Sequence, residues 1–421
     1  MNLPADTPWD IVTAMYSRIA GLALLMTLML QPAPLLAQDT REAALERQRA
    51  EKAKQVEPYN PGKLERALLW YQEVNPVQKL APHNGFYLQY GYQFKPVGSG
   101  LGVGGGYRHD LFHRNARVDL GAGITMRNYQ MLLADFSLPH LADDRIELGV
   151  HALYRHNPQE DFWGIGPDSL NDDRVSYRVN FTDYAVRAIA RPVPWLEAGT
   201  HVGWLSGSIG PGTDTRFPTI EDLFTDADAP GLAAQPDYRY ADVYGAIDYR
   251  DQKNNARAGG YYSLTWRRYT DLDFDLYNFR EIDALVQQFV PIFDKKRVFA
   301  VQARLMSAAA DDGQQVPFYF QPTVGGSTSL RSYNDYRFRD DTGMYFNFEY
   351  RWEAFSALDM ALFYDLGTVV PEVEDLRLST LKKGYGIGFR FNSYKRVLYR
   401  IDIGFGGTDG VRYFFKFSKA F

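Results

Sequence analysis

Few residues in this sequence have the types and spacing of a catalytic or metal site. Cysteine is absent, so thiolate zinc sites, iron–sulfur clusters, disulfides and cysteine nucleophiles are excluded. The seven histidines include no H-E-x-x-H pair, and no G-x-S-x-G sequence occurs. Residues 100–105 fit the pattern G-x-G-x-x-G, but no helix is predicted after them, so dinucleotide binding is not expected.

Two groups of aspartates remain as candidates for ligand chemistry. Asp226 and Asp228 have a spacing similar to that of a calcium loop, but Pro230 occupies a ligand position. The three alternating aspartates of residues 271–275 are expected to belong to a solvated loop. We therefore predict no metal site, no cofactor and no enzymatic activity.

The composition fits a membrane β-barrel better than a soluble enzyme. Of 421 residues, 46 are Lys or Arg and 51 are Asp or Glu, which gives a net charge of -5 and no general attraction to nucleic acid. The mean hydropathy of -0.35 argues against a bundle of membrane helices. Aromatic residues reach 15% and glycines number 36, and both are abundant in barrels.

The N-terminus has the features of an export signal. Residues 19–30 form an apolar run that follows Arg18 and is short for a membrane span. We predict cleavage near Ala37, so that residues 1–37 are a signal peptide, and Met15 is an alternative start. The competing interpretation is a membrane anchor that stays attached.

Residues 38–83 are predicted to be a short periplasmic segment. Residues 40–55 are rich in Ala, Glu, Arg and Lys without an apolar stripe, and residues 63–74 have the spacing of a short helix. This segment is interpreted as a linker, with an amphipathic helix at the membrane as the alternative.

From residue 84 the hydrophobic period changes to two. Apolar residues alternate with Gly, polar and charged residues along successive segments, as strands do between lipid and a wet lumen. We predict an all-β fold over residues 84–421: a transmembrane antiparallel β-barrel of about 16 strands. The predicted strands are 84–94, 100–108, 117–127, 129–138, 145–156, 174–190, 194–207, 237–250, 257–267, 277–289, 298–308, 342–352, 358–368, 384–392, 397–406 and 411–419.

The connections alternate between long and short. Long ones such as 208–236 and 309–341 follow odd strands, and short ones such as 191–193 and 251–256 follow even strands. Long loops outside the cell and short periplasmic turns are typical of outer-membrane barrels.

The last strand ends in an aromatic pattern. Tyr413, Phe415 and Phe417 share one face, and the chain ends at Phe421. A terminal aromatic residue after an alternating strand is similar to the targeting signal of outer-membrane barrels, so we predict location in the outer membrane.

The connection after the eleventh strand carries a sequence motif. Its residues are Gly325, Gly326, Leu330, Arg331, Ser332 and Tyr333. This segment resembles the large loop of the BamA/TamA-type outer-membrane assembly superfamily, also called the bacterial surface-antigen barrel family. In that family a Gly-Gly stretch leads to an Arg-Gly-aromatic tip, and the loop folds into the lumen. Ser332 replaces the family's glycine, so the tip lacks the residue that adopts positive φ angles most readily.

Two further strands match the same family in the same order. Phe363, Asp365 and Gly367 match its Phe-x-Asp-x-Gly strand, and Glu349 matches the inward glutamate of the strand before it. Residues 162–169 are similar to an earlier loop of the family. The resemblance therefore covers the whole barrel.

The resemblance implies that Arg331 ties the loop to the barrel wall. A loop in a wet lumen loses ordering entropy that contacts must offset, and the guanidinium group suits carboxylates. Strand alternation places Asp365 inward. We therefore predict that Arg331 bonds Asp365, with Glu349 as the second acceptor.

The family resemblance also implies a function in the insertion or translocation of other proteins. A weak seam between the first and last strands would expose edges that pair with a client strand. Gly404, Gly406, Gly407 and Gly410, near the last hairpin, are expected to loosen that pairing. The expected partners are outer-membrane lipid and lipopolysaccharide, unfolded outer-membrane proteins as clients, and a separate periplasmic protein, because residues 38–83 are too short for the family's polypeptide-transport-associated domains.

Two other functions stay open from the sequence. One is a passive pore or lipid-handling barrel, which requires an open lumen. The other is a barrel enzyme such as a lipase, which needs a Ser–His pair on the outer wall, with His151 as a candidate.

Overall fold

The computed structural model describes residues 83–90, 100–355, 357–393 and 396–417, together with single residues at 46, 51, 62, 63, 66 and 70. The predicted signal peptide, most of the segment 38–83, and Phe421 lie outside the described residues. Contacts divide the chain into two units, 1–62 and 63–421, and the sheet lies wholly in the second. Among the described residues, no helix is both long and apolar enough to cross a membrane.

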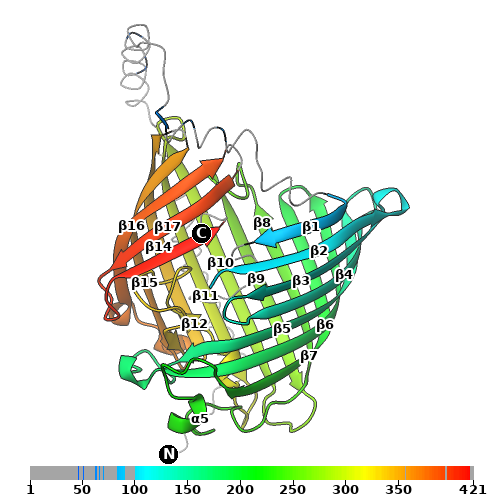
Figure 1. The fold of residues 1–421 in the computed structure, drawn as a ribbon, viewed down its shortest axis with the longest axis vertical. Helices are drawn as coiled ribbons and strands as arrows, with labels where there is room; N and C mark the ends of the chain where they lie inside the picture. Colours follow the sequence, from blue (N-terminus) through cyan, green and yellow to red (C-terminus); the bar gives the residue numbers. More distant parts are fainter. Residues whose placement is uncertain are drawn as a thin grey trace, which may run out of the picture. The chain divides into compact units, whose positions relative to one another are not determined.

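Sixteen strands form one antiparallel sheet in which each strand pairs with its neighbours along the chain (Figure 1). This confirms the predicted fold class. The strands are β1 (Gly85–Tyr90), β2 (Gly102–Leu111), β3 (Ala116–Thr125), β4 (Gln130–Leu141), β5 (Ile146–Phe162), β6 (Val175–Val193), β7 (Leu196–Pro211), β8 (Tyr238–Asp248), β9 (Gly259–Asp271), β10 (Phe279–Ile292), β11 (Arg297–Ala310), β14 (Thr342–Phe355), β15 (Leu358–Val370), β16 (Lys382–Ser393), β17 (Arg396–Phe405) and β18 (Arg412–Phe417).

The remaining elements lie in the connections. A two-stranded sheet of β12 (Thr323–Val324) and β13 (Phe338–Arg339), which the sequence did not predict, forms inside the connection from β11 to β14. The others are the helix α5 (Ile220–Leu223) and short 3₁₀ turns at Phe112–Arg114, Asn171–Asp173, Phe318–Phe320, Val373–Asp375 and Leu378–Thr380.

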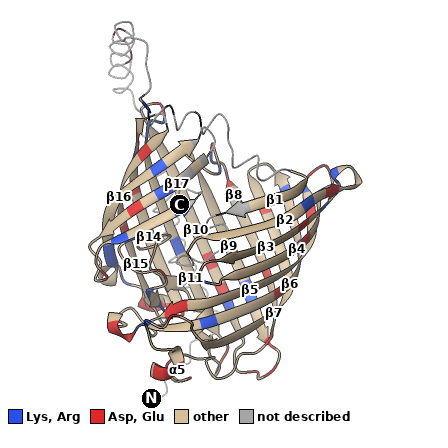
Figure 2. Cartoon of the chain, viewed as in Figure 1, with Lys and Arg blue, Asp and Glu red and all other residues tan. Residues whose placement is uncertain are grey.

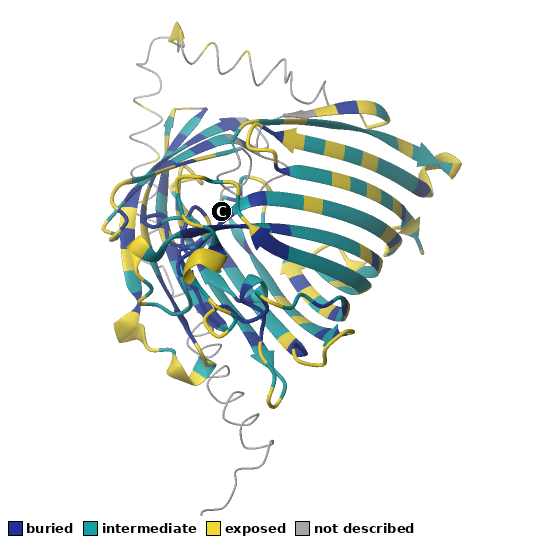
Figure 3. Ribbon diagram, turned by 60° about the horizontal axis from the view of Figure 1, so that its bottom comes forward, coloured by how far each residue is buried: buried dark blue, intermediate teal, exposed yellow. Residues whose placement is uncertain are grey.

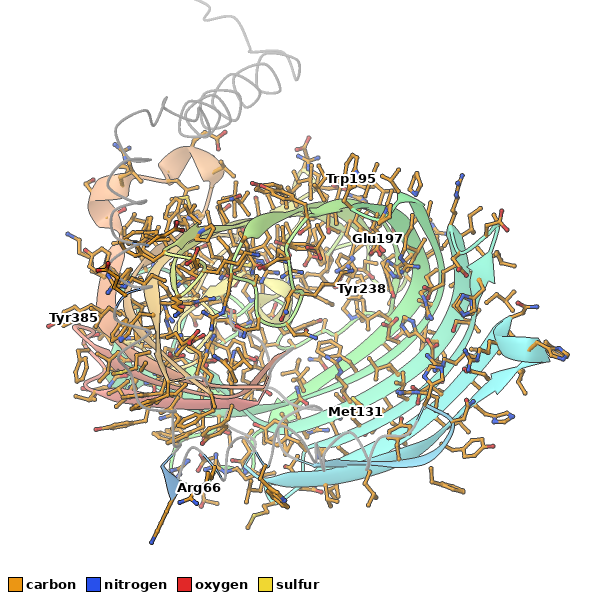
Figure 4. The ribbon with its side chains drawn as sticks, turned by 90° about the horizontal axis from the view of Figure 1, so that it is seen from above. Arg66, Met131, Trp195, Glu197, Tyr238 and Tyr385 are labelled. Carbon is orange, nitrogen blue, oxygen red and sulfur yellow. The ribbon has the colours of Figure 1, made fainter. Side chains whose placement is uncertain are left out.

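Side chains on the strands alternate between an apolar outer face and a polar inner face. Phe86 is 82% exposed while Tyr87, the next residue, is 4% exposed. Figure 3 shows this alternation along the strands, and Figure 2 shows that most of the strand surface carries no charge. In the view from above, Tyr385 points away from the barrel and Tyr238 points into it (Figure 4).

The two ends of the sheet differ. One end, called here the long-loop end, carries the connections 163–174, 212–237, 311–341 and 371–381. The other, the short-turn end, carries the connections 112–115, 142–145, 194–195, 249–258 and 293–296. Exposed aromatic residues mark the short-turn end, as they mark membrane interfaces in barrels; they are Phe112, Trp195, Tyr249, Phe293 and Phe355.

Candidate functional site

The connection 311–341, called here the lumen loop, turns sharply at two glycines. Gly325 and Gly326 have φ angles of 134° and 87°, which residues other than glycine rarely adopt. A Cβ atom on Gly325 would lie 2.5 Å from the Asn334 carbonyl oxygen. The Gly-Gly pair therefore allows the two arms of the loop to pack against each other.

Arg331 is buried at the tip of the lumen loop and bonds two wall carboxylates. Its Nε and Nη2 atoms donate to the two Asp365 oxygens at 2.8 and 2.7 Å, and its backbone N–H donates to Asp365 at 3.1 Å. Its Nη1 atom donates to Glu349. The Phe363 ring lies 3.7 Å from the guanidinium carbon, which adds a cation–π contact. The structure thus brings together the loop arginine and both of its expected acceptors.

A row of amides orients Asp365. Asn347 donates to Asp365 at 2.8 Å and to the Ser329 carbonyl at 2.5 Å. Gln302 donates to Asn347 at 3.0 Å, and Gln287 donates to Gln302 at 2.6 Å. These side chains come from β10, β11 and β14, so three strands contribute to the position of the Asp365 carboxylate.

The ion pairs of Arg331 with Asp365 and Glu349 belong to a larger buried ion cluster. Glu349 also contacts Arg351 at 2.6 Å and Arg390 at 2.9 Å. Asp402 contacts Arg390 and Arg400, each at 2.7 Å. The cluster therefore holds four arginines (331, 351, 390 and 400) and three carboxylates (Glu349, Asp365 and Asp402), all at most 5% exposed. Removing one member of such a set leaves an uncompensated buried charge.

The backbone at the loop tip lies directly against Gly404 and Gly407 of the wall and the last hairpin. A Cβ atom on Gly404 would lie 1.7 Å from the Arg331 carbonyl oxygen, and one on Gly407 would lie 2.1 Å from that of Ser332. These glycines therefore allow close approach of the loop to the wall. Ser332 keeps an ordinary backbone conformation, and its hydroxyl donates to the Phe405 carbonyl. The tip does not require glycine at this position.

Apolar residues on both sides of the tip complete the packing. Leu330 and Tyr333 are buried with Val324, Phe338 and Tyr345. Gly367 lies beneath this cluster, where a Cβ atom would lie 3.0 Å from Val324.

Two more arginines hold the second arm of the loop. Arg337 donates to the Ser169 hydroxyl and carbonyl at 2.8 and 2.7 Å and lies 3.4 Å from Asp409. Arg339 donates to the Phe318 carbonyl, and its own carbonyl accepts from the Gly166 N–H at 2.7 Å. The segment 162–169 is therefore docked on the lumen loop. Sequence reasoning missed both arginines, although their presence with Arg331 in one loop was a usable signal.

Burial of the loop also affects an acid on its second arm. Burial raises the pKa of Asp335 to about 6, although its carboxylate accepts the Ser327 N–H at 3.2 Å.

Aromatic side chains fill the lumen at the long-loop end. Phe318 packs with Phe162, Tyr177 and Ile220 from the wall and from the connection 212–237. Phe320 packs with Tyr238 and neighbouring rings from β9 and β10. The lumen loop thus occupies this end of the barrel with apolar groups.

The remaining candidate residues lie apart from this site. Tyr413 and Phe415 are exposed on the outer face of β18, Phe417 is the last described residue of that strand, and Phe421 lies outside the described residues. His151 lies on the inner face and is 3.2 Å from Asp183. This position does not fit the outer-wall Ser–His pair that a barrel lipase would need.

Asp271, one of the aspartates considered as possible metal ligands, instead binds backbone N–H groups of its own loop. Asp271 accepts the backbone N–H groups of Asp273, Phe274, Leu276 and Tyr277. Within the described ranges, no group of three or more acidic or histidine side chains is arranged to hold a metal ion.

A sixteen-stranded outer-membrane barrel with a loop bound inside its lumen is the class of protein that this fold and site define. Residues 240–419, which hold the second half of the sheet, match the Omp85 superfamily domain of outer-membrane barrels.

Solved structures share the fold at low sequence identity. BamA from Haemophilus ducreyi lacking POTRA domains 1-3 is 13% identical with a TM-score of 0.58, over 80% of this chain and 70% of that chain. CdiB from Escherichia coli is 11% identical with a TM-score of 0.51, over 80% of this chain and 62% of that chain. No curated protein sequence matches the chain.

Proposed function

We propose that this barrel helps to insert or translocate other proteins at the outer membrane through a seam between β1 and β18. The observation that carries the proposal is the lumen loop, whose Arg331 is bound to Asp365 and Glu349. In a passive pore, a loop bound across the interior would narrow the path open to solutes.

The end strands support a seam. Among the described residues, no ladder joins β1 to β18, while every other neighbouring pair in the sheet is laddered. Unpaired backbone groups facing lipid cost several kcal/mol each, on the order of a lost hydrogen bond. An edge of this kind is therefore stabilised by a client strand that adds to the sheet.

The lumen loop is attached next to this seam. Ser332 bonds the end of β17, and the Asn334 N–H donates to Asp409, in the connection from β17 to β18, at 2.8 Å. The loop thereby supports the last hairpin from inside.

The filled lumen argues against the alternative of a passive pore. Buried side chains of the loop occupy the long-loop end, with Phe318 0% exposed and Arg331 2% exposed. The proposed partners are unfolded outer-membrane proteins as clients, the surrounding lipid and lipopolysaccharide, and a separate periplasmic protein.

The first test is insertion of an unfolded reporter barrel into proteoliposomes that contain this protein. We expect faster insertion than in empty liposomes, and loss of the acceleration in Arg331→Glu, because glutamate would face Asp365 and Glu349. Arg187→Glu is the matched control, since Arg187 pairs with Asp135 and Glu147 on the wall.

Unchanged insertion kinetics with well-folded protein would contradict the proposal. A large, steady single-channel conductance of the parent protein would instead favour the pore.

A further inference from the structure

The connection 249–258 between β8 and β9, called here the strap, is folded rather than loose. The Tyr249 and Asp251 N–H groups donate to the Gly260 and Ala258 carbonyls at 3.0 Å and continue the hairpin beyond the strands. The Asp251 carboxylate accepts the Arg257 N–H at 3.0 Å and the Ala258 N–H at 3.1 Å, which closes the turn.

The tip of the strap reaches strands far from its own. Arg257 Nη2 lies 2.7 and 2.6 Å from the two oxygens of Asp359 in β15. The Val397 N–H of β17 donates to the Asn254 carbonyl at 3.3 Å. β9 and β17 are six strand spacings apart in the sheet, or about 29 Å along the wall. A ten-residue hairpin extends only about 17 Å, so the strap reaches β17 across the interior of the curved sheet.

Apolar packing seats the strap against the inner wall. Ala256 is 3% exposed and packs with Phe289, Val298 and Ala300, which β10 and β11 turn inward. The strap therefore lies across the short-turn end of the lumen, next to the ends of the strands that carry the ion cluster.

Two chains of contacts lead from the strap to the lumen loop. In the first, the Phe289 ring lies 5.5 Å from the guanidinium of Arg351, which binds Glu349, an acceptor of Arg331. In the second, Asp359 is the cross-strand partner of Arg390, which also binds Glu349. The strap and the lumen loop thus enclose the same buried cluster from opposite ends.

We propose that the strap is a latch that controls how firmly the lumen loop is anchored. While the strap is seated, the cluster stays dry and its ion pairs act in a low dielectric, where they are strong. When the strap is displaced, water enters from the short-turn end, screens the pairs and weakens the hold on Arg331. A contact made at one end of the barrel is thereby transmitted to the loop inside it, whether or not the barrel inserts proteins.

The absence of cysteine allows a direct test with a single reporter thiol. Ser327 in the lumen loop is 2% exposed, and its hydroxyl has no hydrogen-bond partner within the described part of the chain. The Ser327→Cys protein in detergent is treated with a maleimide, and the labelling rate is measured. Adding Arg257→Gln should raise that rate by about tenfold or more, because labelling follows the population of the open state.

A matched control and a second variant separate the latch from general effects. Lys253→Gln removes the same charge from the same strap, but the Lys253 side chain is exposed and its Nζ atom lies 3.9 Å from the nearby Asp248, so labelling should stay at the parent rate. Ala256→Glu unseats the strap without touching the Arg257 ion pair and should also accelerate labelling.

Folding of each variant is checked by its heat-dependent mobility in gels. Parent-rate labelling of both folded strap variants would overturn the proposal, as would equal acceleration by Lys253→Gln.

Discussion

Ion pairs inside this barrel fall into two groups by burial. Arg331 and Asp365 have side chains that are 2% and 0% exposed, whereas Arg304 and Asp283 on the same inner wall are 35% and 36% exposed. Exposed pairs are screened by water and contribute little, while a buried charge that loses its partner is strongly destabilising. The two groups should therefore respond differently to the same substitution.

We predict that Asp365→Asn lowers the free energy of unfolding by about 3–5 kcal/mol, because Arg331 loses its doubly bonded carboxylate in a buried site. Asp283→Asn, the same change in the exposed pair, should lower it by only about 0–1 kcal/mol. Urea unfolding of the two variants beside the parent measures both values. Similar losses in the two variants would mean that the Arg331 anchor has no special role in stability.

At the scale of elements, the glycines of β16 and β17 have a clear steric role. The backbone of the lumen loop approaches Gly404 so closely that any side chain would overlap the Arg331 carbonyl oxygen. Gly245 in β8 offers a contrast, because no atom lies within 4 Å of the position its Cβ would take. At Gly404 the loop therefore rests directly on the backbone of the wall.

Gly404→Ala should displace the loop tip and expose the lumen loop to trypsin, since the loop and the wall cannot both keep their positions. We expect faster cleavage after Arg331 or Arg337, located by mass spectrometry, while Gly245→Ala should be cleaved at the parent rate. If both variants resisted trypsin equally, close packing of the tip would not be what protects the loop.

At the scale of the whole molecule, the proposed seam between β1 and β18 also has an outer face, which carries exposed aromatic residues. Phe86 of β1 and Phe415 of β18 are both exposed on that face, at 82% and 45%. In a membrane this is the lipid-facing side of the two end strands, where a client strand would enter.

A cross-link across the seam should stop insertion of the reporter barrel. The pair Phe86→Cys and Phe415→Cys can be joined by a bismaleimide without interference from native thiols, because the chain has none. Each single-cysteine variant treated with the same reagent serves as the control. Full activity of the cross-linked protein would exclude a seam that must open.

The sequence by itself determined the strands, because alternation is a local property imposed by lipid on one side and a wet lumen on the other. It also indicated the Omp85-type barrel, since the motif around Arg331 and the strand around Asp365 occur in order along the chain.

Only the tertiary structure decided how the connections fold. The expected short turn at 251–256 is a strap that reaches β17, and Arg337 meets Ser169, which lies 168 positions earlier. The role of Gly404 likewise depends on a loop more than 70 positions away. Contacts of this kind depend on the curvature of the whole sheet, which no local pattern in the sequence records.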